Sequence, residues 1–336
     1  MTVRNFLRLF THVQMLPVLE GGEATLVGGQ AVMEGVMMRA PHSYCVAVRK
    51  PDGEIAMEEL PIKSPSEKYK FLKWPVFRGI GVLGQAMSLG MKALQFSANH
   101  ALAEESDGAS GKNATDEKPI SNWMMGLQLV FSLAFFLFAY KFVPLKLTTM
   151  VAKLLPALNT PGFEGQVLFN LVDGLIRLTI FITFMWLMSL TKDMRRMFEY
   201  HGAEHKVVFN FESGKPVNVA NAQTFVTWHP RCGTSFMFVI MIISMILYMF
   251  IPVQGMLQKM AIRIALLPVV VGVSYELIRF AARKRGSFLS LLTAPGLWTQ
   301  RITTKPPTDD QAEIAVRALQ GAMDLEARQG GELVIA

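Results

Sequence analysis

Two histidines and a carboxylate lie one helical turn apart in the stretch EYHGAEHKVV, residues 199–208. A helix advances about 100° per residue, so the side chains of His201 and His205 project about 40° apart on one face. Glu204 falls within the same arc of about 100°. Two imidazoles at this spacing can bind one Zn²⁺, and a neighbouring carboxylate can orient a water molecule. The spacing therefore predicts a metal site on a helix.

The order His-x-x-Glu-His reverses the zincin motif and is itself a known signature of zinc hydrolases. In that chemistry the metal lowers the pKa of a bound water to about 7, and the glutamate moves its proton. Glu204 is therefore the candidate catalytic residue. Because short motifs also occur by chance, the alternative is an interfacial helix whose histidines are only surface polar groups.

A catalytic zinc site needs a third protein ligand, and the stretch WHPRCGTSF, residues 228–236, offers two candidates. His229 and Cys232 carry the imidazole and thiolate groups that suit zinc. If both join His201 and His205, the site is closed and structural; with three ligands and water it is open and catalytic. Residues 199–233 hold three of the six histidines and one of the two cysteines, which favours a metal. Two carboxylates are weaker candidates for the third ligand, Glu212 and Glu276.

A second group of polar residues lies in the stretch GGQAVMEGVMMRAP, residues 28–41. Its polar side chains in an apolar surround are Gln30, Glu34 and Arg39. One interpretation is a loop packed against the metal site, with these residues supporting the ligands or contacting substrate. The other, which we favour, is a buried turn with a structural Glu34–Arg39 pair, because buried charges are usually paired.

The elements that must position these residues follow from the apolar pattern. Apolar residues make up 51% of the 336 residues and gather in long blocks with almost no charge, which predicts an integral membrane protein. Two short alternating runs around Pro51-Asp52-Gly53 predict a β-hairpin. The expected fold is an α-helical integral membrane protein with about four transmembrane helices and a small α+β cytoplasmic portion that includes the hairpin. The predicted spans are residues 123–140, 167–190, 236–250 and 262–280.

These signals divide the chain into eight segments. They are an N-terminal amphipathic segment (1–25), a cytoplasmic β-hairpin region (26–65), an interfacial or re-entrant helix (66–103), a disordered linker (104–120), transmembrane helices 1 and 2 (121–190), a cytoplasmic segment with the His/Cys cluster (191–234), transmembrane helices 3 and 4 (235–281), and a cytoplasmic C-terminal segment with an amphipathic helix (282–336). In the last segment, Thr308 and Gln311 fit a capping box for a helix over about 309–327.

Lysines and arginines gather after the second and fourth predicted spans, which places those segments in the cytoplasm. An even number of spans then places both termini there. The net charge of +7 is explained in this way, and no basic stretch interleaved with aromatics suggests a nucleic-acid partner. Only two cysteines are present, Cys45 and Cys232, so a disulfide framework is not expected and a reducing compartment is favoured.

Charged residues also occur inside the predicted spans, where they are functional candidates by default. Asp173 and Arg177 are four residues apart and can pair along the second span. This pair is interpreted either as an interhelical lock or as part of a transport path. For Arg263 and Glu276 in the fourth span, the alternative to a functional role is that their side chains extend toward the membrane surface.

Four stretches together resemble a known family, the bacterial YqhQ-like membrane proteins. They are GGQAVMEGVMMRAP, EYHGAEHKVVFNFESG, HPRCGTSF and PGLWTQRITTKPPTDDQAEIAVRAL, and the resemblance extends from about residue 28 to residue 319. That family is a domain of unknown function often labelled "predicted metal-dependent enzyme". The resemblance implies a protein of the bacterial cytoplasmic (inner) membrane and a metal role for the His/Cys cluster, without supplying a reaction.

The leading hypothesis is a zinc-dependent enzyme that catalyses hydrolysis at the cytoplasmic membrane surface. The alternatives are a non-catalytic membrane scaffold with a structural metal, and a small transporter that uses Asp173 and Arg177. The expected partners are the lipid bilayer and either a second copy of the chain or another membrane protein. The sequence does not choose a substrate among peptides, lipids and amides.

Overall fold

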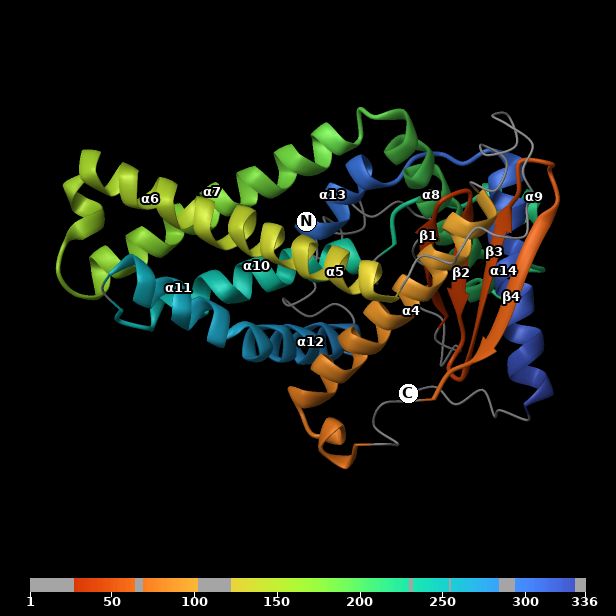
Figure 1. Ribbon diagram of the computed structural model, residues 1–336, viewed down its shortest axis with the longest axis horizontal. Coiled ribbons are helices and arrows are strands. Elements are labelled where there is room, and N and C mark those ends of the chain that lie inside the picture. Colours follow the sequence, from red (N-terminus) through yellow and green to blue (C-terminus); the bar gives the residue numbers. More distant parts are fainter. Residues whose placement is uncertain are drawn as a thin grey trace, which may run out of the picture.

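The computed structural model describes residues 27–63, 69–101, 122–229, 232–253, 255–283 and 294–329 (Figure 1). Long helices form a bundle, and a four-stranded sheet covered by helices lies at one end of it. The predicted amphipathic segment at residues 1–25 and the predicted linker at 104–120 lie outside the described residues.

The sheet is an antiparallel meander in which each strand pairs with the next along the chain. Its strands are β1 (Gly28–Val32), β2 (Gly35–Arg39), β3 (Ser43–Arg49) and β4 (Ile55–Pro61). The hairpin predicted around Pro51-Asp52-Gly53 is confirmed as the β3–β4 connection, where Gly53 adopts a φ of 86° that favours glycine. The sheet also contains a second hairpin, β1–β2, which turns at Met33 and Glu34.

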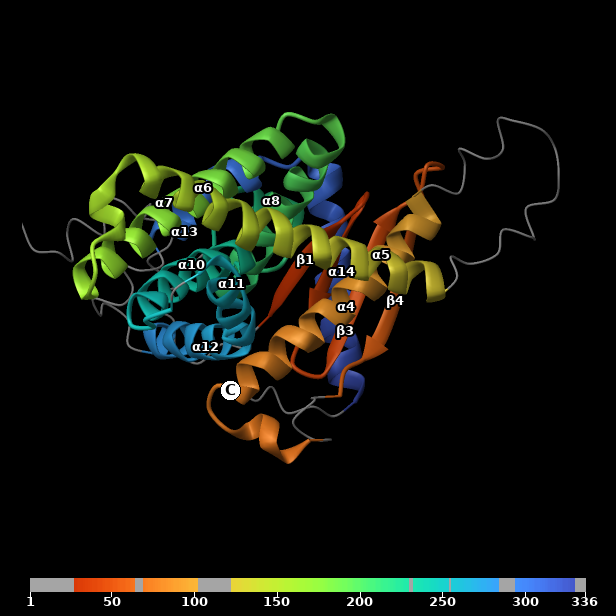
Figure 2. The ribbon, with the colours of Figure 1, turned by 60° about the vertical axis from the view of Figure 1, so that its left-hand side comes forward.

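Both faces of the sheet are covered, because successive side chains of a strand point to opposite faces. On one face Val36, Met38, Cys45 and Ala47 pack with residues of α8 (Lys192–Glu212) and α14 (Asp309–Arg328). On the other face Met37, Tyr44, Val46 and Val48 pack against α4 (Phe77–Ala101). Figure 2 shows α4 crossing in front of the sheet with α14 behind it.

Helix α14 confirms the helix predicted near the C-terminus. Thr308 caps it through the predicted capping box, with bonds in both directions between Thr308 and Gln311. On the apolar face of this amphipathic helix, Ile314 and Leu319 are buried against the sheet. The amphipathic pattern therefore serves sheet packing.

Helix α4 occupies the segment predicted to be interfacial or re-entrant. It is one continuous helix, so a re-entrant break is not observed. Besides covering the sheet, it contacts α12 (Leu267–Arg283), where Gly79 allows close approach of Tyr275. Arg78 of α4 forms an ion pair with Glu276 of α12. Glu276 is therefore held in a helix–helix contact.

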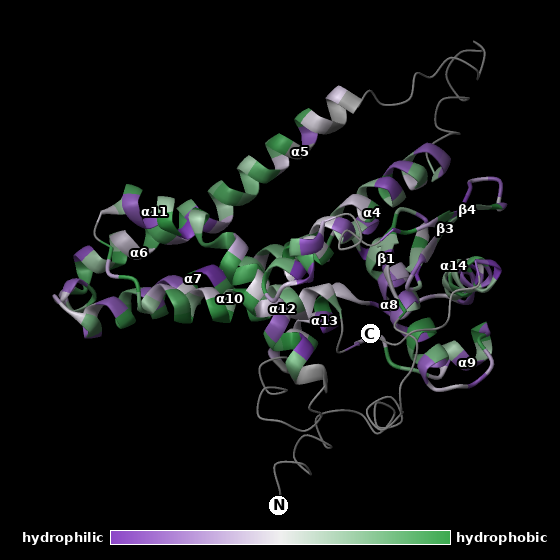
Figure 3. Ribbon diagram, turned by 90° about the horizontal axis from the view of Figure 1, so that it is seen from below, coloured by the Kyte–Doolittle hydropathy of each residue, from purple (hydrophilic) through white to green (hydrophobic). Residues whose placement is uncertain are grey.

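Two helices among the described residues are long and apolar enough to cross a membrane, and a third candidate is bent by 49°. The first candidate joins α5 (Asn122–Leu137) to α6 (Val143–Leu154) through a π-helical turn, and the second is α7 (Phe163–Met188). The bent candidate consists of α11 (Met256–Ala265) and α12. A shorter apolar helix, α10 (Gly233–Met249), packs against α7 and α12. Figure 3 shows the apolar character of α5, α7 and α10.

The prediction of a mostly helical protein with apolar helices and a small sheet is confirmed, while the count of four spans stays a prediction. The end of the first span at residue 140 is corrected, because the helix continues through α6 to Leu154. Leu145 and Ala152 of α6 are buried against Phe169 of α7.

Candidate metal centre

Helix α8 carries His201, Glu204 and His205, as the spacing predicted. It follows α7 after a short turn. Asp193 lies in its first turn, where a negative charge interacts favourably with the helix dipole. The half of α8 that carries the motif is enclosed, with every residue from Gly202 to Asn210 buried. Strand β1, helix α14, helix α9 (Val219–Gln223) and the end of α13 (Ala294–Thr303) surround it. The surrounding elements thus fix the orientation of the motif.

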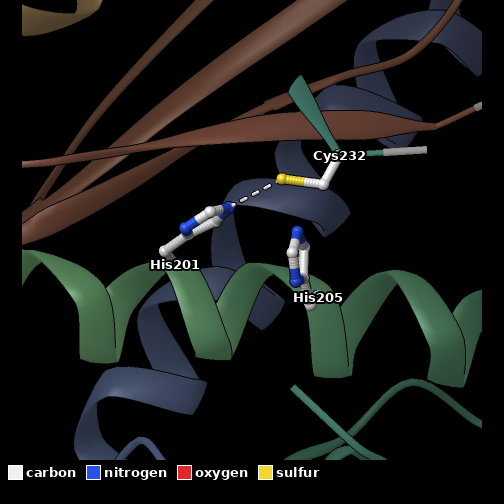
Figure 4. A group of neighbouring side chains, drawn as sticks. All are labelled: His201, His205 and Cys232. Atoms are coloured by element: carbon white, nitrogen blue, oxygen red, sulfur yellow. Dashed lines mark hydrogen bonds between the residues drawn. The ribbon is translucent and has the colours of Figure 1, made fainter. Parts of the chain in front are cut away.

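Cys232 meets the two histidines of α8 from the N-cap position of α10 (Figure 4). One ligand atom from each of His201, His205 and Cys232 can be chosen so that all three lie within 4.8 Å of one another. The Sγ atom of Cys232 lies 3.3 Å from Nε2 of His201. Bond lengths of about 2.0–2.3 Å in a tetrahedral zinc site place ligand atoms about 3.3–3.8 Å apart. The distance between Cys232 and His201 therefore matches the ligand spacing of such a site, and His205 lies within 4.8 Å of both.

Backbone carbonyls set the orientation of both imidazoles. Nδ1 of His201 lies 2.8 Å from the carbonyl oxygen of Thr303, and Nδ1 of His205 is hydrogen-bonded to the carbonyl oxygen of Thr227. A carbonyl oxygen only accepts, so each Nδ1 carries the proton and each Nε2 keeps its lone pair. Metal-binding histidines commonly donate their other ring nitrogen in this way. The donor set of two Nε2 atoms and one sulfur thus fits a zinc ion.

Glu204 is buried beside this cluster. Its Oε2 atom lies 3.9 Å from Nε2 of His201, and the backbone amide of Gly29 in β1 donates a hydrogen bond to its carboxylate. Burial raises the pKa of Glu204, and the adjacent His201 and His229 oppose this shift. A Cβ atom at Gly29 would lie 2.9 Å from Cγ of Glu204. Only glycine at this position lets β1 approach the carboxylate so closely.

His229 lies next to the cluster but outside the group of three ligand candidates. Its ring centroid is 5.7 Å from that of His205, while its Nε2 atom lies 3.3 Å from Glu212. The side chain of Gln300 holds the backbone of His229 through two hydrogen bonds, of 2.7 and 2.8 Å. Burial lowers the pKa of His229 and of His205 to about 4 in each case, so both imidazoles are neutral near pH 7. Of the two predicted third ligands, the structure thus brings Cys232, and not His229, into the ligand group.

The polar residues of the glycine-rich stretch are dispersed. Glu34 forms an ion pair with Arg196 of α8 and lies 3.1 Å from the hydroxyl of Tyr200. Arg39 instead donates a hydrogen bond of 2.9 Å to Gln85 of α4. The expected Glu34–Arg39 pair is therefore corrected, because the β1–β2 turn sends Glu34 toward α8 while Arg39 ends β2 beside α4.

Gln30 of β1 lies against Gly90 of α4, where its amide occupies the space of a Cβ atom. Gln30, Glu34 and Arg39 thus contact neighbouring helices, and the residue of this stretch that contacts Glu204 is Gly29. The weaker ligand candidate Glu276 is held by Arg78, as described above, and Glu212 by His229.

Sequence reasoning missed the carbonyl groups of Thr227 and Thr303, the side chain of Gln300, and Gly29. Every residue has a backbone carbonyl, so the residue type does not reveal which carbonyl contacts a histidine. The pair Gly28-Gly29 was a usable signal, because a glycine in a strand often marks close approach by another group.

Asp173 and Arg177 pair within α7 as predicted, and both side chains are buried. Arg263 of α11 joins them, with its Nη1 atom 2.8 Å from Asp173. The alternative that Arg263 extends toward the membrane surface does not agree with this structure, because the side chain is buried and paired with Asp173 inside the bundle. The pairing across α7 and α11 is what an interhelical lock requires.

Comparison with known families finds one family model that matches most of the chain. Residues 74–325 match the family described as "Protein of unknown function (DUF1385)". The chain belongs to this family. A curated relative, "Uncharacterized protein YqhQ" of Bacillus subtilis (strain 168), is 36% identical over 302 residues, which cover 89% of this chain and 93% of the relative. The resemblance to YqhQ-like proteins is thus confirmed. No solved structure matches the chain.

The matched DUF1385 region contains α8, Cys232 and most of α14, so the His/Cys cluster lies inside the family domain. Neither comparison names a reaction, a metal or a ligand. Chemistry for this family must therefore be argued from the geometry of the cluster.

Proposed function

We propose that this DUF1385 protein is a zinc-dependent hydrolase of the bacterial cytoplasmic membrane, with its catalytic site on the cytoplasmic side. One observation carries the proposal. Three ligand candidates, His201, His205 and Cys232, converge beside the carboxylate of Glu204, while His229 is turned toward Glu212. Three protein ligands leave one tetrahedral position open, which is the arrangement of catalytic rather than structural zinc sites.

A zinc ion held there would polarise a substrate carbonyl and lower the pKa of a water molecule. The chain's own residues supply the rest. Thr303 and Thr227 keep the Nε2 atoms of both histidines directed at the site. Glu204 accepts a proton from the nucleophilic water on a carboxylate oxygen, and the amide of Gly29 holds that carboxylate in place. The burial around α8 excludes bulk water from the reacting groups.

The position of the cluster supports action near the membrane. Helix α7 is a membrane-span candidate, and α8 begins four residues after its end. His201 is nine residues further along α8, about 14 Å at 1.5 Å per residue. Substrates at the membrane surface lie within this reach, and the candidate classes are peptides, lipids and other amides. The proposed topology has four spans, with the bent α11–α12 pair and the shorter α10 as the last two.

A second function is a scaffold whose metal is purely structural. It is favoured by the ring of His229, 5.7 Å from that of His205, because rotation of this side chain would bring a fourth ligand toward the cluster. Four protein ligands would close the site to substrate.

The substitution Glu204→Gln separates the two functions. Glutamine keeps the shape of the side chain but cannot take up the proton, and a general base contributes about 10²–10⁴-fold to rate. For the hydrolase we expect zinc content and expression near wild type, and loss of complementation in a deletion strain. The control is Glu199→Gln, the same change on the same helix, which should complement fully. If Glu204→Gln keeps both zinc and full complementation, the hydrolase is excluded and the structural metal remains.

A further inference from the structure

A second polar centre lies inside the helical bundle, around Asp173 of α7. Asp173 is in contact with Arg177 and Arg263, and the guanidinium of Arg263 also lies 3.1 Å from the amide oxygen of Asn170. Lys141, from the π-helical turn, donates a hydrogen bond of 3.3 Å to the hydroxyl of Tyr248. The exposed fraction of each charged side chain is 1–2%.

Positive charge exceeds negative charge in this centre. Lys141, Arg177 and Arg263 all lie within 6 Å of the ring of Tyr248, measured from the cationic group to the ring centroid, at 5.5, 5.8 and 5.1 Å. Among the described residues of the centre, Asp173 is their one carboxylate partner. The Nε atom of Arg177 is buried without a hydrogen-bond partner in the described part of the chain. Buried charges are normally compensated, so this centre is short of an anion.

A cavity of about 790 Å³ adjoins the centre and lies at the end of the bundle opposite the sheet. Arg263, Asn170 and Tyr248 belong to both the centre and the cavity wall. A further cation, Lys259 of α11, lines the same cavity, with its Nζ atom 3.6 Å from the ring centroid of Phe169. Glu164 is the nearest acid along α7, but it is exposed and is not part of the cavity wall.

Backbone polarity adds to the positive charge. Helix α7 begins after Gly162 and α11 begins after Gly255, and both glycines line the cavity. Neither helix has a side-chain cap at this end, so amide groups of both first turns are available to an anion. The cavity thus combines two helix N-termini with the side chains of Arg263 and Lys259.

We infer that this cavity binds a phosphate-bearing anion, independently of the proposed hydrolase. Lys259 supplies a positive charge at the cavity wall, and Arg263, whose Nη1 and Nη2 atoms already donate to Asp173 and Asn170, adds further N–H groups there. The cavity is much larger than a phosphate ion, and its wall includes Leu158, Phe163 and Phe250. A phosphate attached to an apolar body, as in the headgroup region of an anionic lipid, uses both kinds of wall.

The test measures the ligand-dependent shift in melting temperature of the detergent-purified full chain. Three probes are titrated: phosphatidylglycerol, diacylglycerol and inorganic phosphate. We expect phosphatidylglycerol to stabilise the wild type and diacylglycerol, which lacks phosphate, to have no effect. Stabilisation by inorganic phosphate alone supports the same site with a free anion as its ligand. If neither phosphatidylglycerol nor inorganic phosphate stabilises the protein, the inference is overturned.

The variant is Lys259→Gln, because removal of Arg263 would leave Asp173 partly uncompensated and could prevent folding. Lys153→Gln is the matched control. Lys153 is exposed in the last turn of α6 and does not line the cavity. The apparent affinity should weaken about tenfold in Lys259→Gln, since a contact with a charged group is lost, and stay unchanged in Lys153→Gln. If the two variants bind the probe with equal affinity, binding depends only on nonspecific charge attraction, and the inference is overturned.

Discussion

At the scale of single residues, His229 and Cys232 are three positions apart, yet the structure gives them different surroundings. The sulfur of Cys232 faces Nε2 of His201, whereas Nε2 of His229 faces Glu212. Residue type alone could not separate them, because imidazole and thiolate both suit zinc. The path of the chain between α8 and α10, and the bonds from Gln300 to the backbone of His229, decide which side chain reaches the ligand group.

The substitutions His229→Gln and His205→Gln should therefore differ in their effect on metal content. We expect His229→Gln to retain zinc near the wild-type level, since its ring contacts Glu212 rather than the ligand group. We expect His205→Gln to lose zinc several-fold, because it removes a bond from the metal shell. Zinc per chain in the purified variants is the measurement. Equal loss in both variants would make His229 a ligand and the site closed.

At the scale of elements, β1 connects the sheet to the candidate centre, because Gly29 of β1 contacts Glu204 of α8. A Cβ atom at Gly29 would lie 2.5 Å from the carbonyl oxygen of Met37 and 2.9 Å from Cγ of Glu204. At Gly28, one residue earlier, a Cβ atom would meet no atom within 4 Å. The two neighbouring glycines form a matched pair for testing this contact.

We expect Gly29→Ala to lower the melting temperature of the purified protein and to reduce complementation, because β1 must move away from both Met37 and Glu204. Overpacking of this kind costs about 1–3 kcal/mol. Gly28→Ala should leave both measurements near wild type. Similar behaviour of the two variants would show that β1 does not need to approach Glu204 for stability or function.

The elements could be predicted where the signal is local. The capping box at Thr308 and the turn at Gly53 each lie within a few residues, and both are confirmed. Contacts between distant elements could not be predicted. Nothing in the sequence around Arg263 shows that Asp173, ninety residues away, neutralises it inside the bundle. Likewise, the continuation of α5 into α6 depends on packing of Leu145 against α7.

At the scale of the whole molecule, the candidate metal centre and the cationic cavity lie at opposite ends of α7. Helix α7 begins beside the cavity at Phe163 and ends at Met188, shortly before α8. If α7 crosses the membrane, the two sites face opposite compartments. Under the positive-inside rule, the basic residues after α7 predict that the metal centre faces the cytoplasm.

Reporter fusions test this arrangement. Fusions at residue 110 and at the C-terminus should both report the cytoplasm, because four spans return the chain to its starting side. A reporter inserted in the connection between α6 and α7, residues 155–162, should report the opposite compartment. A cytoplasmic result for the 155–162 insertion, or opposite results for residue 110 and the C-terminus, would contradict the four-span topology.

The central claim is that α8 and the residue preceding α10 together hold a zinc ion, and zinc per chain measures it most directly. The full chain is purified in detergent without chelator, with a histidine-free affinity tag, and analysed by elemental mass spectrometry. The two cysteines provide a matched pair, since Cys45 is buried in the sheet and Cys232 lies in the cluster. We predict about one zinc per chain in the wild type and in Cys45→Ala, and a several-fold loss in Cys232→Ala. A wild type without transition metal, or equal zinc in the two cysteine variants, would contradict the account.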